Sequence, residues 1–100
     1  IATDFALLEA ARFVCYRALD LINKESREAS LWAAMANLLG GDIAFKVVND
    51  AMDIHGGHGY SRELPFERYL RDVKAVQIAN ATLKITIARE LLGREFLPHE

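Results

Sequence analysis

Cysteine is almost absent from this chain. Cys15 is its single cysteine, so no internal disulfide can form. Disulfides are rare in proteins of reducing compartments, where thiols stay reduced. We therefore expect the protein in the cytoplasm or the mitochondrial matrix. Because Cys15 falls on the broad apolar face of a predicted helix, we expect it to be buried as a small hydrophobic residue and not to be reactive.

The chain also lacks an excess of positive charge. Its 12 basic and 14 acidic residues give a formal net charge of −2. Nucleic-acid binding needs a clustered basic surface, so that class of partner is not expected. No run of about 18 apolar residues is present, which predicts no transmembrane helix, and no signal peptide is visible. The first residue is Ile1, not Met, which predicts a processed chain or part of a longer polypeptide.

Proline and glycine are few, with two and six residues, and the intervals between them predict helices. Residues 1–24 contain neither and carry apolar residues at spacings of three and four, with Thr3 as the candidate N-cap. A second helix is predicted over about 27–54, with Ser26 as its cap. Its apolar phase continues through Gly40 and Gly41, which favours one unbroken helix packed closely against another.

The remaining helices are shorter. Pro65 suits the first position of a short helix that runs to about residue 72. Residues 73–81 either extend that helix or form a turn, and a further helix begins near Asn80 or Thr82 and ends at Gly93. The tail, 94–100, is expected to fray. Together these elements predict an all-α antiparallel helical bundle of three long helices and one short helix, in one domain over 1–100.

The glycine-rich loop over 55–63 is the segment that an ordinary helical domain does not require. Its glycines either end a helix and reverse the chain, or present backbone N–H groups to a phosphate. The loop has no G-x-G-x-x-G pattern and follows a helix, so the dinucleotide-binding fingerprint is not met. His55 and His58 lie near Asp53 but lack a fourth convergent ligand. We therefore expect these histidines either to form hydrogen bonds or to be solvated, and we expect no metal.

Charged residues cluster on the short helix that follows the loop. Glu67, Arg68, Arg71 and Asp72 are expected to form ion pairs that stabilise this helix. The alternative is that the two arginines hold an anion beside the glycine-rich loop.

Four motifs succeed one another along the second half of the chain. They are Ile54-His55-Gly56-Gly57-His58-Gly59-Tyr60, Pro65-Phe66-Glu67-Arg68-Tyr69-Leu70-Arg71-Asp72, Gln77-Ile78 and Ile87-Ala88-Arg89-Glu90-Leu91-Leu92. In order and spacing they resemble the C-terminal helical domain of the acyl-CoA dehydrogenase family. The resemblance covers essentially the whole chain but not the family's N-terminal helical domain, its middle β-domain or the first helix of its C-terminal domain. It implies part of an enzyme that uses FAD to remove two hydrogens from the α and β carbons of an acyl-CoA thioester.

The resemblance also implies which residues meet the cofactor and the substrate. Five consecutive residues would lie against the FAD of a partner subunit in a dimer or tetramer: Asp53, Ile54, His55, Gly56 and Gly57. Thr82 and Lys84 would lie beside the FAD of their own subunit, and Ala81 in the acyl-CoA site. Apolar helix faces left exposed in so small a domain also predict self-association.

Three residues depart from the family pattern. Asn80 stands where the catalytic glutamate is expected, and an amide cannot act as a general base at neutral pH. Asp53 replaces a common glutamine, and Lys84, in a Leu-Lys pair that replaces Ser-Glu or Ser-Gln, could pair with a phosphate. The chain itself therefore offers no catalytic residue. Three hypotheses follow. The first is a dehydrogenase whose base lies on the helix that precedes this chain, as in some family branches, and the second is a non-catalytic subunit or interaction module of the same fold. The third is a generic helical bundle without flavin contact, against which the glycine-rich loop and its matched flanks argue.

Overall fold

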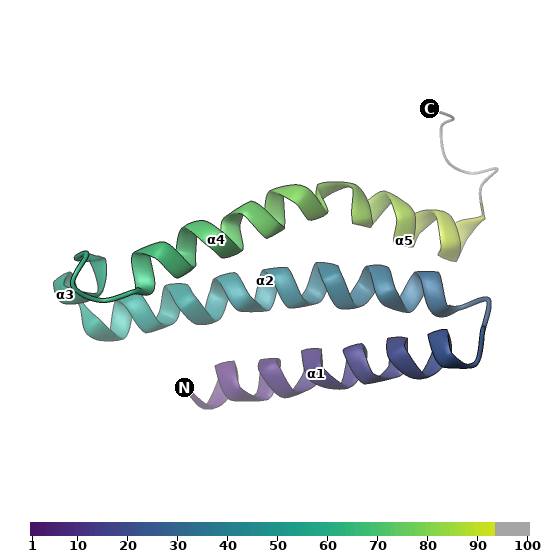
Figure 1. Cartoon of the computed structure of the whole chain (residues 1–100), viewed down its shortest axis with the longest axis horizontal. Helices are drawn as coiled ribbons and strands as arrows, with labels where there is room; N and C mark the ends of the chain where they lie inside the picture. The colour runs from purple at the N-terminus through teal and green to yellow at the C-terminus, as the bar shows by residue number, and fades with distance from the viewer. Residues whose placement is uncertain (94–100) are drawn as a thin grey trace.

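The described residues form helices joined by short turns (Figure 1). The computed structural model describes residues 1–93. The helices are α1 (Ala2–Asn23), α2 (Ala29–His55), α3 (Gly57–Tyr60), α4 (Phe66–Ala79) and α5 (Leu83–Leu92), and a 3₁₀ turn, η1 (Asn80–Thr82), joins α4 to α5. The prediction of an all-α antiparallel fold is confirmed. The prediction for 94–100 lies outside the described residues.

The other long helices of this fold pack on one central helix, α2. Figure 1 shows α1 running antiparallel to α2 on one side, and α4 followed by α5 running antiparallel to α2 on the other. The molecule measures 50 × 30 × 19 Å, with a radius of gyration of 16.3 Å. A compact domain of 100 residues would have a radius of gyration of about 13 Å. The helices therefore form an open layer, and α2 supplies most of the contacts that hold it together.

The two faces of α1 have different surroundings. Ala18 and Leu21 are buried against α2, whereas Cys15, Phe5 and Leu19, on the neighbouring stripe, are exposed. The prediction that Cys15 is buried is wrong. The apolar face of α1 is wider than the stripe that one neighbouring helix can cover, and Cys15 lies on the part that α2 does not reach.

The central helix α2 is continuous through Gly40 and Gly41, as predicted. Its buried residues are Ala34, Gly41 and Ile43. By length and composition alone α2 could cross a membrane, a test that the core helix of a soluble protein also passes. Although α1, α4 and α5 all pack against α2, only 17% of its apolar window is buried within the described residues.

Three helix starts differ from the prediction. Thr3 lies inside the first turn of α1, because the helix begins at Ala2. Ser26 lies before α2 and accepts a hydrogen bond from the Glu28 N–H (3.2 Å), so it stabilises the turn that leads into the helix. Pro65 is the residue before α4, not its first residue. Gly93, with φ of 88°, ends α5 as predicted.

The segment formed by α4, η1 and α5 is divided into helices at a different place from the prediction. The helix that opens at Phe66 runs for 14 residues and absorbs most of 73–81, and the break falls at η1. Within residues 1–93 the ion pairs expected of Glu67, Arg68, Arg71 and Asp72 do not form. Arg68 instead lies over the Tyr69 ring, 5.8 Å from its centroid. All four side chains lie on one helix at spacings of one, three, four and five. Such spacings permit ion pairs, but the sequence alone does not show which pairs form.

Large apolar side chains remain exposed on every long element of the described chain, and none of them is fully buried. The most exposed lie at Ile1, Phe5, Phe13, Ile54, Tyr60, Ile78 and Leu91. Exposed apolar area on this scale is typical of a surface that another segment or subunit covers.

Candidate functional site

The glycine turn begins where α2 ends. His55 is the last residue of α2, and Gly56 follows with φ of 61° and ψ of −143°, a conformation that only glycine adopts without strain. The Gly56 N–H donates to the Asp53 carbonyl (3.1 Å), and the Gly59 N–H donates to the Gly56 carbonyl (2.9 Å). The chain thus reverses over one residue and enters the single turn of α3. The predicted loop over 55–63 is therefore partly helical.

The glycines of this turn differ in their surroundings. A Cβ added at Gly56 or Gly57 would meet nothing within 4 Å, so the backbone is open to an approaching group at both positions. A Cβ at Gly59 would lie 2.6 Å from the Met52 carbonyl oxygen and 3.0 Å from His55 Cβ. Gly59 is buried and lets α3 pack on the end of α2, whereas Gly56 and Gly57 face solvent.

Both histidines of the turn are exposed, and each lies close to a polar group. His55 Nδ1 lies 2.8 Å from the Ala51 carbonyl oxygen, which can only accept, so Nδ1 carries the proton. The His55 ring also packs on Phe66, with centroids 4.6 Å apart. His58 Nε2 lies 3.1 Å from a carboxylate oxygen of Glu63. Within residues 1–93, His, Cys, Asp and Glu side chains do not gather in groups of three that could hold a metal ion.

A shallow hollow lies beside the turn. Asp53 projects at its edge and is exposed, as is Ile54. The lining comes from the end of α2, the turn and α4: Asn49, Met52, Asp53, Gly56, Tyr60 and Leu70. The hollow therefore offers open glycine backbone, an exposed phenol ring and one carboxylate. A carboxylate repels a nearby phosphate but accepts hydrogen bonds from sugar hydroxyls.

The second group of predicted site residues lies at η1 and the start of α5. Ala81, Thr82 and Lys84 are exposed there. Asn80 turns the other way: its Nδ2 donates to the main-chain carbonyl of Asn37 in α2 (2.9 Å). The structure does not bring this group to the glycine turn. Along α2 the two levels, Gly41 and His55, are 14 residues or about 21 Å apart.

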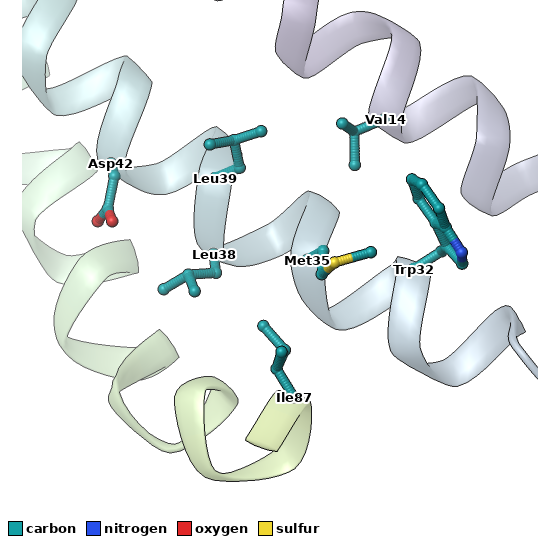
Figure 2. Close-up of a pocket in the computed structure, with 7 residues that line it drawn as sticks. All are labelled: Val14, Trp32, Met35, Leu38, Leu39, Asp42 and Ile87. Carbon is teal, nitrogen blue, oxygen red and sulfur yellow. The ribbon is translucent and has the colours of Figure 1, made fainter. Parts of the chain in front are cut away.

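An apolar hollow of about 400 Å³ lies between α1, α2 and α5. Figure 2 shows its lining, with Val14 from α1 and Ile87 from α5 on either side of α2. The α2 residues are Trp32, Met35, Leu38, Leu39 and Asp42. The Asp42 carboxylate is engaged by Gln77 Nε2 (3.0 Å). The hollow thus suits apolar side chains and lacks the convergent polar groups of a catalytic site.

Sequence reasoning missed the contacts that hold the two groups in place. Gly59 was not among the predicted site residues, and the link from Asn80 to Asn37 joins residues 43 apart in sequence. One available signal was the spacing of Gln77 and Asn80, which puts two amides on one side of a helix. Another was the pair of glycines at 40 and 41, a sign of close helix approach.

Comparison with known proteins identifies the family. The family model described as "Acyl-CoA dehydrogenase, C-terminal domain" matches residues 2–95. The cyclohexane-1-carbonyl-CoA dehydrogenase of Syntrophus aciditrophicus is 43% identical over 94 residues, which cover 91% of this chain and 24% of that protein. The 3-sulfinopropanoyl-CoA desulfinase of Paraburkholderia xenovorans is 38% identical, over 88% of this chain and 23% of that protein.

A solved structure has the same fold. It is described as the electron transferring flavoprotein of Acidaminococcus fermentans, and one of its chains matches with a TM-score of 0.84 and 38% identity, over 92% of this chain and 25% of that chain. This chain spans about a quarter of the length of the curated relatives it matches. The resemblance read from the glycine turn and the helical motifs is thereby confirmed, and the chain belongs to the acyl-CoA dehydrogenase family as a C-terminal helical domain.

Proposed function

We propose that this chain is the C-terminal part of a longer flavoprotein that dehydrogenates an acyl-CoA thioester at its α and β carbons. Family membership over 2–95 carries the proposal. The bound FAD would accept the hydride from the β carbon. Exposed apolar faces along α1, α2 and α5 support self-association into a dimer or tetramer. The single cysteine supports a cytoplasmic or mitochondrial matrix location.

The glycine turn fits a role against the FAD of a partner subunit. Its open backbone at Gly56 and Gly57 admits a flat or charged group at contact distance. Asp53 favours the adenosine side of the cofactor over the diphosphate, because its carboxylate can accept from ribose hydroxyls and would repel phosphate oxygens. His55 is fixed by its bond to Ala51 and by Phe66, and Ile54 is exposed beside it, so both can form the wall of such a site.

The η1 region fits the same subunit's FAD and the acyl-CoA site. Thr82 can donate or accept through its hydroxyl, and the exposed Lys84 can pair with a phosphate. Ala81 offers a small apolar surface to the substrate. Asn80 provides no base, so the proton on the α carbon must go to a carboxylate outside this chain.

A non-catalytic subunit is the second candidate. The observation that favours it is Asn80, which lacks a carboxylate and is bonded to α2.

The visible absorption spectrum of the native protein, purified from its source, separates these candidates. A flavin spectrum that bleaches on addition of a mixture of acyl-CoA thioesters is the result expected of a dehydrogenase. A bound flavin that every thioester in a broad panel leaves oxidised would favour the non-catalytic subunit. If the native protein contains no flavin, neither the glycine turn nor the η1 region contacts FAD, and both of these assignments are rejected.

A further inference from the structure

The α4–α5 junction is tied to α2 by two side-chain amides. Gln77 Nε2 donates to a carboxylate oxygen of Asp42 (3.0 Å), and Asn80 Nδ2 donates to the main-chain carbonyl of Asn37 (2.9 Å). Gln77 and Asn80 are three residues apart, so both amides leave the same side of the α4 end. The α-helical hydrogen-bond pattern changes to 3₁₀ at Asn80 itself. The two bonds thus lie where α4 ends and the direction of α5 is set.

A glycine on α2 permits this approach. Gly41 is buried, and a Cβ there would lie 3.1 Å from Asn80 Nδ2 and 3.5 Å from Val76 Cγ1. A Cβ at its neighbour Gly40 would meet nothing within 4 Å. Of the two adjacent glycines, therefore, only Gly41 lies under the Asn80 amide, and Gly40 serves as its natural control.

The chemistry of the Asn80 bond requires a donor at this position. The acceptor is a peptide carbonyl, which has a second lone pair available besides the one used within α2. A carboxylate of the same shape would set oxygen against oxygen, and alanine would leave the carbonyl without this partner. The Asn80 side chain is thus directed toward α2, whereas Thr82 is exposed to solvent.

We propose that Asn80 is a positioning residue: its donated hydrogen bond clamps η1 onto α2 and fixes the direction in which α5 leaves. The clamp itself is independent of any cofactor. Its consequence, that Thr82 and Lys84 are held where a flavin can reach them, rests on the proposed function. Position 80 then has a mechanical role in this chain, and a carboxylate there would weaken the domain.

Thermal unfolding of the full polypeptide tests the clamp. Asn80→Asp keeps the shape and removes the donor, so the midpoint should fall by about 2–4 °C at pH 7, the shift typical of one lost hydrogen bond in a polypeptide longer than about 150 residues. Lowering the pH through the carboxyl pKa should restore much of the difference, because a protonated carboxyl can donate to Asn37. Asp42, which accepts a hydrogen bond from Gln77 one turn away, is present in both proteins. A difference that does not change with pH would refute the donor role.

A double-mutant cycle provides the second test. Gly41→Ala should lower the midpoint when Asn80 is present and should not lower it in the Asn80→Ala background, where the crowded amide is gone. Gly40→Ala should leave the midpoint unchanged or raise it in both backgrounds. If Gly41→Ala costs the same in both backgrounds, no coupling exists between the two residues and the clamp is refuted.

Flavin titration of the native polypeptide tests the positioning step. Asn80→Asp should weaken flavin binding severalfold at pH 7, with recovery at low pH in parallel with the midpoint, and Gly40→Ala should not weaken it. Unchanged affinity in Asn80→Asp, with the stability effects present, would overturn the positioning role and leave only the clamp. If the native protein binds no flavin, the proposed function fails, and the cycle between Asn80 and Gly41 still decides whether the clamp exists.

Discussion

Gly59 offers the sharpest test of how the glycine turn is built. In Gly59→Ala the new Cβ would lie 2.6 Å from the Met52 carbonyl oxygen and 3.1 Å from Met52 Cα. Carbon and oxygen normally approach no closer than about 3.3 Å, so the overlap is about 0.7 Å. The nearest atom belongs to the backbone of α2, which cannot swing aside as a flexible side chain can. Relief therefore requires α3 to move away from the end of α2.

The expected cost follows from two opposing effects. Overpacking of this kind costs about 1–3 kcal/mol. Alanine in a helical position recovers about 0.8–1.0 kcal/mol relative to glycine. The net destabilisation is therefore between about 0 and 2 kcal/mol. In a domain of this size each 1 kcal/mol lowers the unfolding midpoint by about 4–8 °C.

Gly57→Ala is the matched control, because a Cβ at Gly57 meets nothing within 4 Å and Gly57 has no positive φ. Circular dichroism at 222 nm should show a lowered midpoint for Gly59→Ala alone. On the proposed function, Gly57→Ala should weaken flavin binding without a loss of stability. Equal midpoints for the two variants would refute the argument that Gly59 is required for packing and Gly57 is not.

Three further predictions concern other parts of the chain. Lys46 Nζ donates to Asp4 (2.8 Å) and Asp50 (2.6 Å), which raises the pKa of Lys46 to about 12, Asp4 being the larger cause. Its stabilisation is complete below the unfolded pKa of 10.5 and is lost as pH rises through about 12. Lys46 also lowers the pKa of Asp50, whose contribution is present above 3.8 and is lost as pH falls through the lower folded value. Lys46→Met should therefore lower the midpoint most near neutral pH, and a pH-independent difference would contradict this. The exposed Cys15 should react with a maleimide as fast in the folded chain as in denaturant, and at least about tenfold more slowly in a native assembly that covers α1; mass spectrometry measures both rates, and equal rates in the assembly would leave α1 uncovered. Asp53→Ala should weaken flavin binding by about tenfold or more, as for loss of a charged hydrogen bond, whereas tighter binding by Asp53→Asn would place the diphosphate there.

Helix existence was predictable because it depends on local pattern. The apolar phase of α2 continues across Gly40 and Gly41 in the sequence, and the structure has one helix there. The same kind of pattern could not predict how many neighbours a face has. Residues such as Cys15 and Leu19 lie on an apolar stripe, but α2 covers only the adjacent stripe, and within residues 1–93 these two side chains remain exposed.

The candidate site was predictable as a location but not as a set of contacts. Three glycines after a helix indicate a turn, and Gly56 adopts the conformation that requires one. Which glycine is exposed to solvent and which is packed depends on where α3 contacts Met52, and this contact belongs to the tertiary structure. Likewise, the sequence alone shows that the Asn80 amide cannot act as a general base. Its hydrogen bond to Asn37 could not be predicted, because that bond depends on how closely two helices approach.

The two groups of candidate residues share α2 as their common support. The glycine turn is the continuation of its C-terminal end, and η1 is clamped at the level of Gly41. A continuous helix is stiff over these 14 residues, so it holds the two groups about 21 Å apart. On the proposed function these groups face two different flavins, one in each subunit of a dimer. The unbroken passage of α2 through Gly40 and Gly41 would then fix the spacing between two cofactors, because a kink at that pair would move one site relative to the other.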